Sequence, residues 1–265
     1  MEILGYISSI IIGISLGLIG GGGSILTVPV LVYLFKVDAI LATSYSLFIV
    51  GATSAIGSVN YFQKGLVNLK TAIVFGIPAI ISVFLTRALI VPAIPDELFT
   101  IGSLMITKSI LIMVIFAVLM ILASYSMIKK PVVKEQIIEK QKFNYPLIIV
   151  EGGVVGILTG LVGAGGGFLI IPALVVLSKL PMKEAVGTSL VIIAAKSLIG
   201  FFGEGALGHD IKWTFMITLT AFAIIGIFIG SYLSKKIDGN KLKPAFGWFV
   251  LIMGIYILLK ETVLK

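Results

Sequence analysis

One charged residue stands inside a long apolar stretch, where a charge needs a chemical partner. Lys196 lies in the run 191–202, which otherwise holds only apolar and small residues. A lysine at the centre of a membrane helix costs roughly 2.5–3.5 kcal/mol on insertion scales. A bound anion would offset this cost, directly or through an exchangeable partner such as Glu151. A permanent structural pairing with Glu151, or extension of the side chain to the membrane surface, would also do so, and the sequence leaves these alternatives open.

Two glycine clusters could bring backbone N–H groups to the same anion. The stretch 17–32, GLIGGGGSILTVPVLV, returns 143 residues later as 160–175, GLVGAGGGFLIIPALV, which indicates an internal duplication. A short helix that begins inside the membrane presents unsatisfied N–H groups and about half a positive charge, and glycine lets an anion approach them. Glycines that only permit tight helix packing are the competing interpretation. The predicted binding residues of the clusters are Gly21, Gly22, Gly23, Ser24, Gly165, Gly166 and Gly167.

Hydroxyl groups follow each cluster, where the next long helix begins. They are Thr43 and Ser44 in the first half and Thr188 and Ser189 in the second. We interpret the two Thr-Ser pairs as corresponding positions of the repeat. Ser and Thr cap helix N-termini well, so capping is one interpretation. Donation of hydrogen bonds to the oxygens of an anion is the other. All four are therefore candidate binding residues.

Composition places these residues in a membrane and excludes several kinds of chemistry. The 265 residues are 58% hydrophobic and 12% charged, and the mean hydropathy is +1.18, which predicts an integral membrane protein. The absence of cysteine excludes disulfides and thiol chemistry, and a single histidine leaves little basis for a metal site. The chain lacks paired acids or a Ser/His set, so we expect no catalytic residue, no cofactor and no enzymatic activity.

The apolar runs define an all-α fold of two repeats. Each repeat contains a glycine-broken helical hairpin and three membrane-spanning helices, because the arm at 24–35 reaches only about 18 Å and is too short to cross. The first repeat covers 1–128, a polar linker covers 129–144, and the second repeat covers 145–265. The predicted hairpin arms are 3–19, 24–35, 145–162 and 168–177, and the predicted spans are 40–62, 71–91, 108–128, 183–202, 213–234 and 244–259.

Small residues and one arginine have structural interpretations. Glycines spaced by four residues allow close helix contact in lipid, and we expect packing to be their role. Arg87, near the end of the run 71–91, is expected to anchor its helix at the membrane interface. The spaced glycines are Gly13 and Gly17, then Gly152, Gly156 and Gly160, and later Gly226 and Gly230.

The distribution of lysine and arginine predicts the topology. If each glycine-broken pair is one continuous span, the two sides of the membrane receive 10 and 9 basic residues, and the positive-inside rule predicts no orientation. If each pair is a hairpin that returns to the same side, the split is 13 to 6. The linker is then cytoplasmic and both termini are extracytoplasmic. Three crossings per half invert the second repeat relative to the first, which is typical of secondary transporters.

The doubled glycine motif, followed in each half by a small residue and a Thr-Ser pair, resembles the sulfite exporter TauE/SafE family of membrane permeases. The resemblance covers nearly the whole chain, with glycine at position 21 as a mild departure from the family pattern. It implies a secondary transporter in the cytoplasmic membrane that moves a small anion, often a sulfur-containing one such as sulfite, a sulfonate or sulfoacetate.

Other functions remain as alternatives to the transporter. An anion channel would also use broken helices, and a non-transporting membrane scaffold or an intramembrane enzyme would share the composition. The expected partners are a small anionic substrate and membrane lipid. The net charge of +8 lies in short loops, so we expect no nucleic acid, and homo-oligomerisation stays open.

Overall fold

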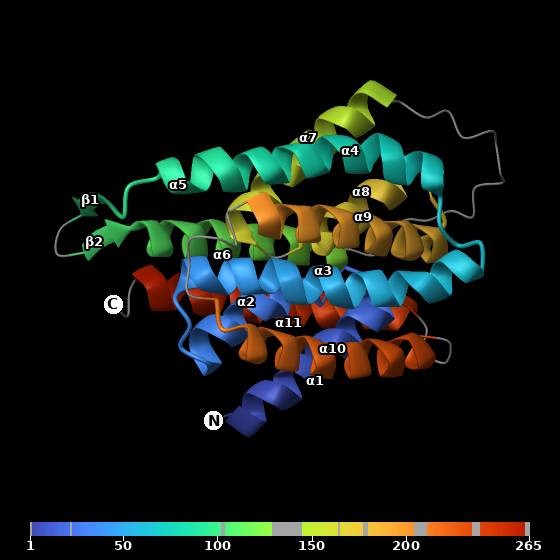
Figure 1. Cartoon of the computed structure of the whole chain (residues 1–265), viewed down its shortest axis with the longest axis horizontal. Helices are drawn as coiled ribbons and strands as arrows, with labels where there is room; N and C mark the ends of the chain where they lie inside the picture. Colours follow the sequence, from blue (N-terminus) through green and yellow to red (C-terminus); the bar gives the residue numbers. More distant parts are fainter. Residues whose placement is uncertain are drawn as a thin grey trace.

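The protein is an all-α integral membrane protein whose long helices run side by side (Figure 1). The structure is a computed structural model, and it describes residues 2–21, 23–101, 104–128, 145–163, 165–176, 180–203, 211–234 and 239–262. The first half contains α1 (Glu2–Ile19), α2 (Ser24–Pro29), the π-helical turn η1 (Val30–Leu34), α3 (Ala39–Gln63), α4 (Leu69–Leu85), the π-helical turn η2 (Thr86–Ile90), α5 (Val91–Ala93) and α6 (Lys108–Ile128). The second half contains α7 (Tyr145–Val162), α8 (Gly167–Val176), α9 (Met182–Gly203), α10 (Trp213–Leu233) and α11 (Gly239–Thr262).

Apolar side chains cover the outside of the bundle as well as its inside. Within the described residues, five helices are long and apolar enough to cross a membrane: α3, α4 extended through α5, α6, α9 and α10. On α4, Ile73, Ile77 and Ile81 are each more than half exposed, while Phe75 and Ala79 on the other face are buried. An exposed apolar stripe of this length is stable against lipid and not against water.

The first glycine-broken pair is a hairpin and not one continuous span. A methyl group built on Gly23, just before α2, would lie 2.5 Å from the carbonyl oxygen of Ile12 in α1. A methyl group built on Gly5, near the start of α1, would meet the ring of Phe35, just after η1. The chain after the glycines therefore runs back along α1 to the side from which α1 started. This geometry favours the hairpin alternative of the sequence analysis.

The two halves exchange helices. The hairpin helix α1 packs along α10 of the second half, and α7 packs along α4 of the first half. The helices α3 and α9 pack against each other, as do α6 and α11. In Figure 1, α3 runs from left to right and α9 from right to left, and the β-hairpin and the end of α11 share the left end of the bundle. These directions favour an inverted repeat, whose orientation in the membrane and boundaries stay a prediction.

Two hydrogen bonds fix the register between the halves. The hydroxyl of Thr188 in α9 accepts a bond of 2.9 Å from the N–H of Asn68, which caps the start of α4. The hydroxyl of Tyr45 in α3 accepts one of 2.8 Å from the N–H of Lys212, at the start of α10. Tyr45 thus corresponds to Thr188 at the interval of 143 residues. The predicted match of the two Thr-Ser pairs is therefore out of register by two residues.

The packing role predicted for the spaced glycines is confirmed. A methyl group on Gly13 would lie 2.9 Å from the Cα of Gly226, so α1 and α10 are in backbone contact. In the same way a methyl group on Gly156 would lie 2.6 Å from the carbonyl oxygen of Ala79 in α4. Close backbone approach of this kind is how small residues hold helices together in lipid.

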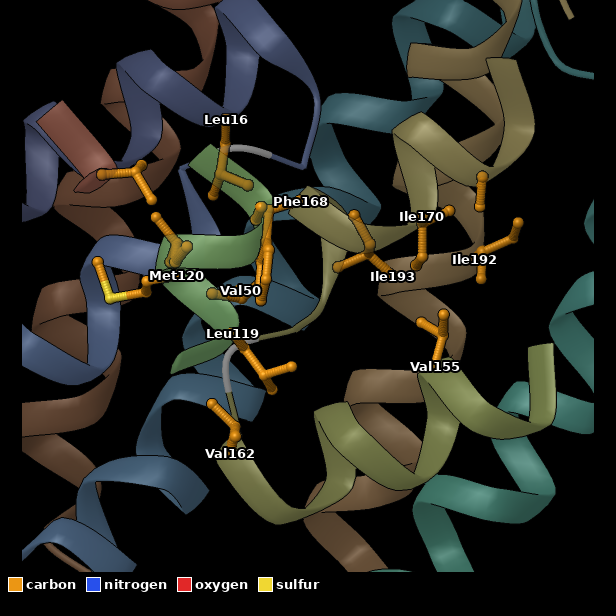
Figure 2. Close-up of a cluster of buried hydrophobic side chains, with 14 of the residues drawn as sticks. Leu16, Val50, Leu119, Met120, Val155, Val162, Phe168, Ile170, Ile192 and Ile193 are labelled. Atoms are coloured by element: carbon orange, nitrogen blue, oxygen red, sulfur yellow. The ribbon is translucent and has the colours of Figure 1, made fainter. Parts of the chain in front are cut away.

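The core lies where the hairpins meet the crossing helices. Buried side chains from α1, α3, α6, α7, α8 and α9 form one cluster, in which Figure 2 shows Leu16, Val50, Phe168 and Ile193 from four of these helices. The sequence analysis did not predict the antiparallel β-hairpin of β1 (Glu97–Ile101) and β2 (Leu104–Thr107) that joins α5 to α6. The predicted linker 129–144 lies outside the described residues.

Candidate anion site at the hairpin loops

The loops at the ends of the two hairpins touch each other inside the bundle. A methyl group built on Gly21 would meet the backbone of Gly167, and one built on Gly167 would meet the backbone of Gly21. The described glycines of both loops are buried, and those of the second loop lie against Val50 of α3 and Ile193 of α9. The structure therefore brings the two predicted glycine clusters together, except for Gly22, which lies outside the described residues.

Neutral groups surround the described residues of the first loop. The nearest side-chain atoms to a methyl group on Gly20 belong to Val186, Ile171 and Ser189, and Gly23 packs on the backbone of α1. The hydroxyl of Ser24 is buried and donates to the carbonyl oxygen of Gly21 at 2.7 Å. Ser24 thus closes the loop on itself in this conformation.

A buried ammonium group lies against the second loop. Lys196 is 1% exposed, and its Nζ donates to Oγ1 of Thr159 in α7 at 2.8 Å. A methyl group built on Gly166 would lie 2.6 Å from the same Nζ, so the ammonium contacts the loop backbone just before α8 begins. Gly165 and Gly166 have φ of +65° and +67°, a conformation that glycine adopts readily and other residues rarely do. These glycines therefore let the backbone pass close to the charge.

Glu151 does not pair with Lys196 in this conformation. Both residues belong to the described part of the chain, and no ion pair joins them. Thr159, which accepts from Lys196, lies two helical turns along α7 from Glu151, a distance of about 12 Å along the helix axis. Direct structural pairing, one of the alternatives for Lys196, is therefore not the arrangement observed, and neither is extension of its side chain to the membrane surface.

A second buried cation contacts the second loop, and the sequence analysis misassigned it. Arg87 in the turn η2 is fully buried, so its predicted role as an anchor at the membrane interface is wrong. Its Nη1 donates to Oγ1 of Thr43 at 2.8 Å, and a methyl group built on Gly163 would lie 2.6 Å from its Nη2. The signal in the sequence was the position of Arg87 itself, because Leu89, Ile90 and Val91 continue the apolar run beyond it.

The four candidate hydroxyl residues are all buried, and none caps its own helix. Asp38 caps α3, and the hydroxyls of Thr43 and Ser44 both donate to the carbonyl oxygen of Ile40. Ser189 donates to the carbonyl oxygen of Val186, and Thr188 accepts from the start of α4. Thr43 lies at the second loop and Ser189 at the first, as the methyl groups built on Gly163 and Gly20 show. Ser44 and Thr188 are not among the nearest neighbours of the described loop glycines.

Further buried hydroxyls lie on the crossing helices. Thr53 and Ser54 of α3 and Ser197 of α9 have buried hydroxyl oxygens without a hydrogen-bond partner among the described residues. Thr53 occupies in α3 the place that Lys196 occupies in α9, and Ser54 the place of Ser197. A buried hydroxyl without a partner is unfavourable unless water or a ligand satisfies it.

Comparison with known proteins agrees with the resemblance seen in the sequence. The profile of the family described as sulfite exporter TauE/SafE matches residues 6–257, which is nearly the whole chain. The chain belongs to the sulfite exporter TauE/SafE family. No solved structure matches it.

Several relatives of this TauE/SafE protein are named as transporters. A probable membrane transporter protein of Xylella fastidiosa is 28% identical over 256 residues, covering 94% of this chain and 91% of the relative. The probable membrane transporter protein YunE of Bacillus subtilis is 26% identical, covering 97% of this chain and 96% of the relative. A probable membrane transporter protein of Methanocaldococcus jannaschii is 37% identical over 117 residues, covering 42% and 43% of the two chains. The protein is therefore a multi-pass membrane transporter.

Proposed function

We propose that this transporter is a secondary carrier of a small anion, sulfur-containing as the family description suggests. The anion is bound at the buried hairpin loops, and access alternates between the two sides by movement of one half against the other. The carrier lies in the cytoplasmic membrane, with its linker in the cytoplasm and both termini outside. It has no enzymatic role, no cofactor and no nucleic-acid partner.

The observation that carries the proposal is the buried ammonium of Lys196 against the loop that precedes α8. A charge in this position is costly, and ionisable residues inside membrane proteins usually face a substrate pathway. The ten-residue helix α8 begins at the same loop, so its positive dipole end adds to the charge of the ammonium. Both groups attract an anion, and both lie deep in the bundle, as the sites of secondary transporters with broken helices do.

A channel has a continuous path that is open to both sides of the membrane, whereas a carrier opens its binding site to one side at a time. The backbones of Gly21 and Gly167 are in contact, so the two loops leave no opening between these two residues in this conformation. A carrier that exposes its site to one side at a time needs a closed centre, whereas a conducting channel needs an open one. This contact supports the carrier.

The proposal is tested with the purified protein. A thermal-shift screen against sulfite, thiosulfate, taurine, sulfoacetate, carboxylates and phosphate should show stabilisation by one class of small anion. Proteoliposomes loaded with that anion should then accumulate the labelled anion by counterflow, which a channel does not support. Absence of stabilisation by every anion, together with absence of counterflow, would contradict the anion carrier.

A further inference from the structure

We propose that the anion is bound off the centre of the molecule, at the second loop alone, between Arg87 of the first half and Lys196 of the second. Arg87 and Lys196 then act as the two specificity-determining residues, and the first loop is a neutral structural counterpart. This inference rests on the proposed function as an anion carrier. It adds Arg87 as a binding residue and places the anion at the second loop, neither of which the repeated glycine motif indicates.

Arg87 is held at the loop by its own helix. The helix α4 passes at Thr86 into the π-helical turn η2, and Arg87 is the second residue of this turn. Its guanidinium is buried between the hydroxyl of Thr43 and the backbone of Gly163. Turns of this kind are rare and often occur at functional sites. The guanidinium of Arg87 therefore points into the bundle, whereas that of an interfacial anchor would point towards the membrane surface.

The two cations lie at opposite ends of one short loop. The guanidinium of Arg87 contacts Gly163, and the ammonium of Lys196 contacts Gly166. Two residues separate these glycines, so their Cα atoms are no more than about 11 Å apart. In this proposal the small anion lies between the two contacts, beside the first N–H groups of α8.

The residues that correspond to these two charges at the first loop are neutral. The counterpart of Lys196 in α3 is the neutral Thr53. The helices α4 and α10 correspond at an interval of 144 residues, since Gly156 faces Ala79 and Gly13 faces Ala223. Arg87 then corresponds to the neutral Ser231 of α10. The two halves share a repeated backbone, but the cationic side chains Arg87 and Lys196 both lie at the second loop.

The pair also indicates a class of substrate. The planar guanidinium presents two parallel N–H groups and matches a pair of oxygens, whereas the ammonium is a compact point charge. An oxyanion with two or more oxygens can use both ligands at once. A halide cannot accept the two parallel bonds in the same way. The site should therefore prefer small oxyanions to halides.

The first test uses the wild-type protein and needs no substitution. Backbone amide exchange is measured by mass spectrometry with and without the anion that stabilises the protein. We expect protection of peptides covering 83–90 and 160–168 and unchanged exchange in the peptide covering 17–24. Equal protection of both loops would overturn the off-centre site while leaving the anion carrier intact. Absence of anion binding by the wild-type protein would instead remove the proposed function and this inference with it.

The second test uses Arg87→Gln with Ser231→Ala as the matched control in α10. Arg87→Gln should weaken binding of the oxyanion by about tenfold to a hundredfold, because bonds to charged groups are the strong ones. Ser231→Ala should bind within about twofold of wild type. Arg87→Lys keeps the charge, so it should remain folded and bind, but its preference for the oxyanion over chloride should fall. Wild-type affinity and preference in the Arg87 variants, or equal weakening by Ser231→Ala, would refute the assignment.

Discussion

The two hairpin loops descend from the same repeated sequence, but their surroundings differ. Gly20 and Gly163 correspond, and both have positive φ, +82° and +69°. Three residues further on, Gly23 has φ of −67° and enters its helix directly, whereas Gly166 has φ of +67° and lies against an ammonium group. The duplication supplies two similar frameworks, and the buried charges of Arg87 and Lys196 distinguish one from the other. A site that combines a repeated backbone with unrepeated charges can be specific without being symmetric.

The largest expected effect is the presence or absence of cysteine labelling, which tests whether the two halves are inverted. The native chain has no cysteine, so single cysteines can be introduced at Lys134 in the linker and at Lys265. An impermeant thiol reagent applied to intact cells should label the cysteine at 265 and not the one at 134, as the 13 to 6 split of basic residues predicts. The same labelling result at 134 and 265 would break the comparison at its base, because the two halves would then not be inverted. Labelling of 134 and not of 265 would instead reverse the predicted orientation.

The next effect compares the two residues at the same place in the crossing helices. Lys196→Met should reduce anion binding by about tenfold to a hundredfold, because it removes a charged donor at the second loop. Its melting temperature without anion should stay near that of wild type, because methionine keeps the length of the side chain and removes a costly charge. Binding is measured by anion-dependent melting shifts.

The control for Lys196→Met is Thr53→Val in the first half. It should leave anion affinity within about twofold of wild type, since Thr53 belongs to the neutral side. Equal anion stabilisation in Lys196→Met and wild type would exclude Lys196 from the site. A large fall in melting temperature that Glu151→Gln reverses would instead favour a structural pairing formed in another conformation.

A further comparison separates occupation of the site from backbone strain. Gly165 and Gly65 have nearly the same φ, +65° and +67°, but a methyl group on Gly165 would contact Val50 and Ser24 while one on Gly65 would meet nothing within 4 Å. Leucine at either position should incur the strain of about 1–2 kcal/mol that the left-handed region imposes. Only Gly165→Leu should also abolish counterflow. Normal counterflow in Gly165→Leu would leave packing as the role of this loop.

The smallest expected effect concerns stability and uses two neighbouring glycines of α7. A methyl group on Gly152 would lie 2.5 Å from the carbonyl oxygen of Phe75, whereas one on Gly153 would lie no closer than 3.7 Å to Ser82. Gly152→Ala should therefore lower the melting temperature by about 2–8 °C, the shift expected for about 1–2 kcal/mol. Gly153→Ala should leave it unchanged or raise it slightly. Equal melting temperatures would contradict the backbone contact of α7 with α4.

The helical framework could be predicted because lipid imposes strong rules on sequence. A crossing helix needs a long apolar run, and an arm such as 24–35 is too short to be one. The glycines that hold helices together were readable for the same reason, since only small residues permit backbone contact such as that of Gly13 with Gly226. The sequence does not predict the β-hairpin, because its two short strands lie between the apolar runs 71–91 and 108–128.

The charges of the site were harder to predict than its backbone. Lys196 was conspicuous because apolar residues flank it on both sides, but its partner Thr159 lies on another helix and no spacing connects them. Arg87 lies near the end of an apolar run, and depth along a helix does not say which way a side chain points. The register error between Thr43 and Thr188 has a similar origin, since a two-residue motif aligns equally well at neighbouring intervals. The partner of Lys196, the direction of the Arg87 side chain and the register of the two Thr-Ser pairs all depend on contacts between helices that are far apart in the sequence.

The exchange of helices between the halves also affects how the chain is made. The helix α1 precedes the other described helices in the chain, and its partner α10 (Trp213–Leu233) is synthesised only after every helix between them. Until then the close-packing surface of Gly13 and Gly17 faces lipid or an insertion factor. Neither half contains the main partner of its first hairpin arm, which is α10 for α1 and α4 for α7, so each half made alone would be an incomplete assembly. Two separately translated halves would thus have to find each other in the membrane before α1 and α7 acquired their main neighbours.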